Sequence, residues 1–229
     1  MKVADPTHAT EKSARSASER NQPRRTQAER SEEMRKRLAD AAYQVIAKRG
    51  HSGLRMAAVA EQAGVSQGAL LHHFPDKDSV TLAAIRHALA IAHEEAEKKL
   101  SRTTDTVDEL LDIMLDDFRS FFLGDQFWVA LGVTLDASTT PKMRPRIQEI
   151  VAELRKPIYD EWTQRFIELD HNEDRANEIV RTAAALVSGS AIRTLWAERD
   201  EITQAIELRW RQSVIDEHQA LQTHSNENS

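Results

Sequence analysis

The chain alternates between long stretches with apolar residues at helical spacing and short polar breaks. Over residues 32–49 the apolar side chains recur every three or four positions, which places them on one face of a helix. Similar periodicity continues to about residue 221, and no stretch shows the strict alternation typical of a half-buried strand. The breaks fall at 76, 101–105, 124–125, 138–141, 170–174 and 199–201. The pattern predicts an all-α protein of about nine helices.

The two ends of the chain lack this periodicity. Residues 1–31 have almost no large apolar side chains and are rich in Ser, Thr, Glu, Lys and Arg. Such a composition buries too little apolar surface to offset the loss of chain entropy on folding. We therefore expect a disordered tail over residues 1–31 and another over residues 222–229.

Residues 54–74 (LRMAAVAEQAGVSQGALLHHF) predict two short helices joined by a tight turn. Gly64 permits the left-handed backbone of that turn, and Ser66 is a good N-cap for the second helix. The second helix buries Leu70 and Phe74 on its inner face. Its outer face, which has no partner within the chain, carries Gln67, Gly68, Ala69, Leu71 and His72. Two such helices are what a reader of the DNA major groove requires.

This segment resembles the tetracycline-repressor (TetR) family of regulators. The run at 60–77 (AEQAGVSQGALLHHFPDK) carries the resemblance, together with Lys-Arg-Gly at 48–50, and the likeness covers about residues 32–90. It implies an N-terminal three-helix DNA-binding domain over residues 32–78 and a larger helical domain for ligand binding and dimerisation over residues 79–221. It also implies a homodimer whose two heads enter successive major grooves of a palindromic operator, about 34–36 Å apart.

The resemblance assigns roles to single residues of the DNA-binding domain. The family's base-reading face falls on Gln67, Gly68, Leu71 and His72, where Gln67 suits an adenine edge and Leu71 a thymine methyl. Lys77 stands where the family has a phosphate-binding lysine. The full set of expected DNA contacts is Arg55, Gln67, Gly68, Ala69, Leu71, His72, His73 and Lys77. The chain departs from the family in having Leu71 in place of the usual Tyr and Arg55 in place of Ser or Thr.

The distribution of charge agrees with a DNA-binding front. The net charge is −6, yet residues 1–78 carry 14 Lys and Arg against 10 Asp and Glu, and the remainder carries 17 against 27. A basic front and an acidic back indicate that only the front meets an anionic partner. Ordinary solvated charge explains the same numbers, so charge alone does not decide.

The second half of the chain contains bulky apolar residues that suit a cavity for a small apolar or aromatic effector. The expected ligand-binding residues are Met114, Phe118, Phe122, Trp128, Leu131, Trp162 and Phe166. Each of them alone is more often part of a plain core. The last two long helices carry apolar faces with small residues between 183 and 190, which predict a homodimer interface. The alternative is that both helices cap their own domain.

Several classes of protein are disfavoured. The chain has no cysteine, no glycine-rich phosphate loop and no serine in a nucleophile elbow, so we expect no enzyme and no cofactor. His72 and His73 are adjacent and point about 100° apart on a helix, so we expect no metal site. The chain has no apolar run of membrane-spanning length and no secretory signal, so we expect a cytoplasmic protein. Two alternatives stay open: an activator of the same fold, and a helical protein-interaction module without specific DNA binding.

Overall fold

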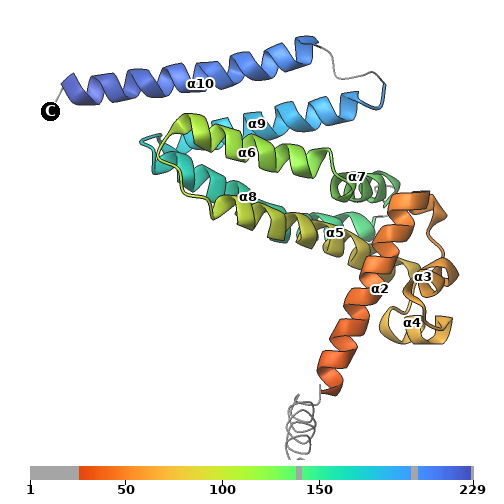
Figure 1. The fold of residues 1–229 in the computed structure, drawn as a ribbon. Coiled ribbons are helices and arrows are strands. Elements are labelled where there is room, and N and C mark those ends of the chain that lie inside the picture. Colours follow the sequence, from red (N-terminus) through yellow and green to blue (C-terminus); the bar gives the residue numbers. More distant parts are fainter. Residues whose placement is uncertain (1–25, 138–140, 197–200, 228–229) are drawn as a thin grey trace, which may run out of the picture. The chain divides into compact units, whose positions relative to one another are not determined.

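The computed structural model describes residues 26–137, 141–196 and 201–227. In these residues every regular element is a helix, nine α-helices and one short 3₁₀ turn, which confirms the expected all-α fold (Figure 1). The elements are α2 (Gln27–Arg49), η1 (His51–Gly53), α3 (Met56–Ala63), α4 (Gln67–His73), α5 (Lys77–Leu100), α6 (Val107–Phe122), α7 (Asp125–Ala137), α8 (Met143–Ile167), α9 (Glu173–Arg193) and α10 (Glu201–Glu227). By its contacts the chain divides between Lys36 and Arg37.

Helix α2 begins five residues earlier than the apolar pattern predicts. The Thr26 N–H donates to Glu29 Oε2 at 2.7 Å, and the Glu29 N–H donates to Thr26 Oγ1 at 3.2 Å. This reciprocal capping box satisfies free backbone donors at the start of the helix. Residues 27–31 and 222–227, which fall within the tails expected over 1–31 and 222–229, are helical in the structure. Residues 1–25 and 228–229 lie outside the described residues.

From Arg37 onward, α2, η1, α3 and α4 enclose a small apolar core. Helix α2 ends at Arg49 because Gly50 takes a left-handed backbone with φ of 69°. Several side chains of this core expose 4% of their surface or less, among them Leu38, Ala42, Val45, Ile46, Leu54, Val59, Ala60, Leu70 and Phe74. These residues are the apolar positions of the sequence pattern, so local periodicity determines this part of the fold.

The longer helices form a second, larger core. Helix α5 packs along α8 and also contacts α6 and α7, while α9 packs on α6 and α8 (Figure 1). Trp162, Phe118 and Phe166 are fully buried between these helices. The Arg86 guanidinium of α5 donates to both carboxylate oxygens of Glu153 on α8, at 2.5 and 2.8 Å. None of the described helices is long and apolar enough to cross a membrane.

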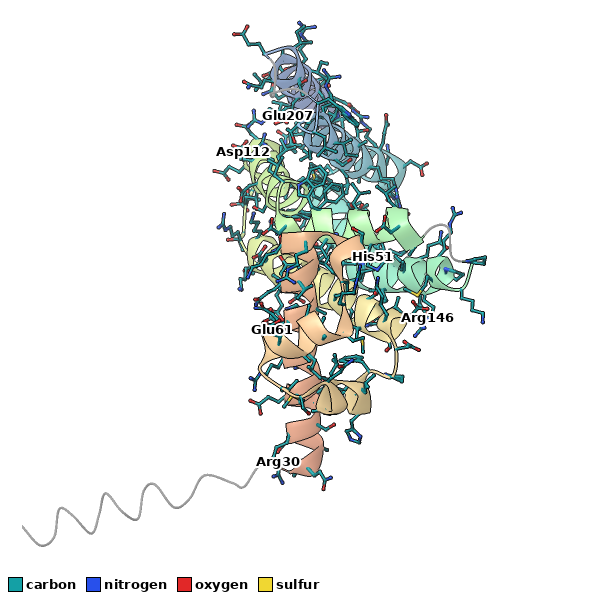
Figure 2. The ribbon with its side chains drawn as sticks, turned by 90° about the vertical axis from the view of Figure 1, so that its right-hand side faces the viewer. Arg30, His51, Glu61, Asp112, Arg146 and Glu207 are labelled. Carbon is teal, nitrogen blue, oxygen red and sulfur yellow. The ribbon has the colours of Figure 1, made fainter. Side chains whose placement is uncertain are left out.

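Helix α10 contacts α6 and α9, and much of its attachment is ionic. One buried valine, Val214, faces its neighbours, and three arginines bind carboxylates across the contact. The ion pairs are Arg119 of α6 with Glu207, Arg211 with Asp108 and Asp112 of α6, and Arg175 of α9 with Glu217. Asp112 and Glu207 are labelled on these neighbouring helices in Figure 2.

Two buried histidines pack against each other where α10 meets the loop between α8 and α9. His171, in the loop between α8 and α9, stacks on His218 of α10 with ring centroids 5.1 Å apart. Phe166 contacts the His171 ring at 5.9 Å. Burial and the neighbouring His218 lower the pKa of His171 below its ordinary value of 6.5. The neutral form of His171 is therefore the one that this packing stabilises.

Candidate functional site

The turn between α3 and α4 has the geometry that the sequence predicts. Gly64 adopts φ 64° and ψ 38°, in the left-handed region. Its N–H bonds to the Glu61 carbonyl at 3.0 Å, and the Val65 N–H bonds to the Ala60 carbonyl at 3.0 Å. This pair of hydrogen bonds is a Schellman motif, which ends α3 and turns the chain sharply into α4. The turn therefore fixes the direction of α4.

Helix α4 presents one face to the core and the other to solvent. The Ser66 hydroxyl accepts from the Ala69 N–H at 3.2 Å and caps the helix, while Leu70 and Phe74 are buried. Gln67, Gly68, Leu71 and His72 are exposed, and Ala69 and His73 are half-buried. Leu71 exposes 44% of its surface.

Gly68 is open to a partner outside the chain. A Cβ at this position would meet only the Ser66 hydroxyl, at 3.9 Å, which is ordinary contact. Its φ is not in the left-handed region, so neither backbone strain nor crowding within the chain requires a glycine here. Glycine also destabilises a helix relative to alanine. The space beside Gly68 is therefore open on the exposed face of α4.

Lys77 and Arg55 lie at helix starts near this face. Lys77 is exposed at the first position of α5, directly after the Asp76 N-cap. Hydrogen bonds from the backbone N–H and side chain of Ser79 hold the pKa of Asp76 below its usual range, and Arg146 adds attraction (labelled in Figure 2). Arg55 precedes α3 and provides no side-chain cap. Its Nη1 donates to the carbonyls of Ser52 at 2.6 Å and Leu54 at 3.1 Å, so part of its guanidinium is already engaged.

Two polar connections link this helix-turn-helix to the larger core. The His51 ring, labelled in Figure 2, lies between Asp136 of α7 (Nδ1 to Oδ2, 3.1 Å) and Thr81 of α5 (Nε2 to Oγ1, 3.3 Å). A second connection runs from α3 through α2 to α5. It consists of Gln62 to Gln44 at 2.6 Å, Gln44 to Asp40 at 2.9 Å and His87 to Asp40 at 3.2 Å. Both connections join side chains distant in sequence.

The expected ligand-binding residues come from three helices. Met114, Phe118 and Phe122 lie on α6, Trp128 and Leu131 on α7, and Trp162 and Phe166 on α8. The structure brings Phe118, Phe122 and Trp128 into one series of ring contacts. Phe118 and Phe122 are 6.3 Å apart, Phe122 and Phe127 are 5.0 Å apart, and Phe127 and Trp128 are 5.3 Å apart. Phe166 lies apart from this series, against His171.

Sequence reasoning named Phe121 and Phe127 as bulky residues of this region but missed Tyr159, Asp117 and Arg155. Phe121 and Phe127 belong to the ring series, and Tyr159 of α8 contacts Phe118 at 5.7 Å. Asp117 is 2% exposed and accepts a hydrogen bond from Trp162 Nε1 at 3.0 Å; burial raises its pKa. Arg155 is 3% exposed. Helical spacing places Asp117 beside Met114 and Phe121, on the apolar face of α6. Charged residues are rarely buried, so their charge argued against predicting either residue in the core.

Some apolar residues of α9 and α10 are buried within the chain, and others are exposed to solvent. Ile179, Ala183, Val187 and Ser190 of α9 are buried within the chain. The exposed apolar residues at and near the facing ends of α9 and α10 are Leu195, Trp196, Ile202 and Ile206, with exposures of 60%, 77%, 72% and 48%. Beside them a groove of about 370 Å³ runs between α9 and α10 and includes Leu186, Gly189 and Ile206. Half of the predicted dimer face therefore belongs to the protein's own core.

Comparison with known proteins agrees with this arrangement. Residues 38–84 match the family model described as bacterial regulatory proteins, tetR family. The HTH-type transcriptional regulator CymR of Pseudomonas putida is 35% identical over 178 residues, which cover 78% of this chain and 87% of that protein. The HTH-type transcriptional regulator BetI of Brucella anthropi is 28% identical over 176 residues, which cover 76% of this chain and 88% of that protein. These relatives are regulators of transcription, which confirms that the chain is not an enzyme.

Solved structures show the same fold at lower identity. A TetR-family regulator from Mesorhizobium loti aligns with a TM-score of 0.63 at 15% identity, covering 84% of this chain and 98% of that one. A regulator from Saccharomonospora viridis, solved in complex with choline, aligns with a TM-score of 0.58 at 20% identity, covering 79% of this chain and 95% of that one.

Proposed function

This chain belongs to the tetR family of bacterial regulatory proteins, and from that premise we propose that it is a cytoplasmic, effector-responsive repressor of a palindromic operator. It is a DNA-binding regulator of transcription by family. The observation that carries the finer proposal is the outward face of α4, where Gln67, Gly68, Leu71 and His72 are exposed beside a fixed turn. An exposed helix face on a rigid support is suited to the major groove.

In this proposal the contact residues of the DNA-binding head, the helix-turn-helix and its flanking residues up to Lys77, form two groups. Gln67 and Leu71 contact base edges and determine which sequence is preferred. Lys77, with Arg55 and His73, contacts phosphates and positions the head without reading sequence. Ala69 and His72 complete the face. Ala69 is half-buried, so it presents less surface to the DNA than its exposed neighbours do.

The proposed dimer forms through α9 and α10. The exposed Leu195, Trp196, Ile202 and Ile206 support this interface, because large apolar side chains at such exposures are rarely left in water. Gly189 supports it as well: a Cβ there would meet no atom within 4 Å, which leaves room for a second helix to approach. Two pairs of helices then pack as a four-helix bundle.

The proposed response begins at the ring series of α6, α7 and α8. Met114, Leu131, Trp162 and Phe166 would surround it as further contacts for an apolar or aromatic effector. Helix α7 carries Trp128 near its start and Asp136 near its end, about 12 Å along the axis. Asp136 bonds to His51 of the head, so a displacement of α7 by a ligand changes the placement of the head. Effector and operator then weaken each other's binding reciprocally.

The first test is a fluorescence-anisotropy titration of the full-length protein against DNA from upstream of its own coding region. Scrambled competitor DNA and two salt concentrations belong in the same experiment. Tight, competitor-resistant binding that weakens steeply with salt supports the proposal. Binding that does not distinguish this DNA from competitor, followed by failure of selection from random DNA, contradicts it.

Two variants sharpen that test. Lys77→Ala should weaken binding by a similar factor on all sequences and reduce the salt slope by about one. Gln67→Ala should instead change the preferred base at one position of each half-site. If both variants bind as the wild type does, α4 does not enter the groove as proposed.

A further inference from the structure

The core between α6 and α8 contains a cation without a partner. Arg155 of α8 is 3% exposed, and its Nε, Nη1 and Nη2 atoms have no hydrogen-bond partner in the structure. A guanidinium carries its charge at every physiological pH and has five N–H donors to satisfy. Buried arginines are therefore normally paired with an anion. Among the described residues, Arg155 is the only lysine or arginine in the buried class.

Aromatic rings cover the guanidinium but leave its donors free. Its Cζ lies 3.9 Å from the centroid of Phe121 and 5.5 Å from that of Tyr159. Contact with ring faces attracts the charge, because the face of an aromatic ring is electronegative. The planar N–H groups at the edge of the guanidinium are not satisfied by this stacking. Phe121 contacts Phe122 at 5.0 Å and Phe127 at 5.8 Å, so Arg155 lies at one side of the ring series.

The nearby acid does not neutralise Arg155 by direct contact. Asp117 is buried on α6, and its carboxylate accepts from Trp162 Nε1 at 3.0 Å. Arg155 attracts it at longer range, which opposes the rise in the pKa of Asp117 that burial causes. Two basic side chains of α5 and α6 have partners of their own: Lys99 binds Asp116 at 2.7 Å, and Arg119 binds Glu207. In the part of the chain that the structure describes, Arg155 is therefore the buried cation whose N–H groups can still bind an anion.

The helix that carries Arg155 is weakened at this point. Pro157 lies inside α8 and has no N–H to donate to the carbonyl of Glu153. The turn of α8 that holds Arg155 therefore lacks one bond of the helical ladder. Tyr159, Phe127 and Trp128 are half-buried, so the ring series reaches the surface on that side. A local shift of α8 and of these rings would admit a ligand.

We propose that Arg155 anchors the carboxylate of an effector whose body is aromatic or apolar. The carboxylate pairs side by side with two guanidinium N–H groups, and the body lies against Phe118, Phe121 and Phe122. A single buried cation fits a monoanion, whereas a phosphate ester or nucleotide requires more positive charge than this site contains. The inference rests on the proposed function, since it names the chemical class of the effector and the residue that selects it.

The test compares carboxylates with their neutral amides. Full-length protein is titrated with 3-phenylpropanoate and naphthalene-2-carboxylate, and with the primary amide of each, by calorimetry and tryptophan fluorescence. We expect the carboxylates to bind about tenfold or more tightly than the amides. Arg155→Met should abolish this preference. Lys156→Met is the matched control, because it removes a cation one residue away that pairs with Asp160 at the surface.

A second readout separates ligand binding from a structural role. Without ligand, Arg155→Met should unfold at the same or a higher temperature than the wild type, because it removes a buried charge that has no partner. A clear loss of thermal stability with an unchanged carboxylate preference overturns the proposal. So does equal binding of acid and amide by the wild type, or no binding of either carboxylate at millimolar concentration.

The operator titration distinguishes this inference from the proposed function. If the protein binds its operator and a neutral compound releases it, the regulator proposal stands and the Arg155 inference fails. If the carboxylates bind through Arg155 and leave operator affinity unchanged, the site is supported and the effector role fails.

Discussion

The Nδ1 atom of His51 lies 3.1 Å from Oδ2 of Asp136, across 85 residues of sequence. His51 belongs to the short turn after α2, and Asp136 is the last acidic residue of α7. Their contact joins the DNA-binding head to the helix that also carries Phe127 and Trp128. It is a direct physical route between the two proposed binding sites.

Replacing Asp136 should therefore reduce the effect of bound effector on operator affinity more than it reduces operator affinity itself. We expect Asp136→Ala to change operator affinity by less than about fivefold, because a partly exposed pair contributes about 0.2–1 kcal/mol. The drop in operator affinity caused by saturating effector should become smaller. A double-mutant cycle with His51→Ala checks that the pair is responsible, since the double variant should behave like either single one. A full effector response in Asp136→Ala would exclude this route.

Gly68 offers a variant in which stability and function move in opposite directions. Gly68→Ala should stabilise the protein by about 0.5–1 kcal/mol, because alanine is the better helix residue and its Cβ meets nothing closer than 3.9 Å. Operator affinity should fall, because that Cβ occupies space that the DNA approaches. Thermal unfolding and anisotropy measure the two effects. Gly132→Ala on α7 is the control; its Cβ meets nothing within 4 Å, and it should stabilise without weakening DNA binding.

The dimer interface is tested at Ile206, which is 48% exposed beside the groove between α9 and α10. Ile206→Glu should weaken the dimer by about 2 kcal/mol or more, because a carboxylate loses its hydration when the helices associate. Light scattering over a range of concentrations measures the change. Leu208→Glu, on another side of the same helix, should leave the dimer intact. Equal effects of the two variants would place the interface elsewhere.

The buried histidine pair makes stability depend on pH. The pKa of His171 is lowered in the folded state, so the unfolded chain takes up a proton at about pH 6.5 while the folded protein does not. The free energy of unfolding should therefore fall as the pH drops below about 6.5, and stay level with respect to this group above it. His171→Phe, which keeps a ring against Phe166 and His218, should reduce the dependence. Denaturant titrations at pH 5.5 and 7.5 provide the measurement.

The helix-turn-helix could be predicted because its signals are local. The left-handed turn at Gly64, the cap at Ser66 and the burial of Leu70 and Phe74 each depend on residues within one or two helical turns. The early start of α2 was missed for a related reason. Thr26 and Glu29 form a cap without any apolar face, and a search for apolar periodicity does not detect that pattern.

The interior of the second core could not be predicted in the same way. Arg155 lies at helical spacing from Val151 and Ile158 on α8, but its charge favours the surface. Only the packing of α6 against α8 shows that it is buried. The apolar face of α9 was predicted, but its burial within the chain was not, for the same reason. Ile179 and Val187 are apolar whether they face α6 or a second subunit, and only the tertiary arrangement decides between the two.

Salt can act on this protein in two places: at the proposed contacts with DNA phosphates, and at the ion pairs that attach α10. The pairs of Arg175 with Glu217 and of Arg211 with Asp112 are partly exposed, so counterions screen them. Raising the ionic strength would then loosen the helix proposed to join the subunits, while it also displaces the heads from phosphate. The measured dependence of operator binding on ionic strength would be steeper than the number of phosphate contacts alone predicts. If the protein represses as proposed, a rise in intracellular salt would weaken that repression through both linkages together.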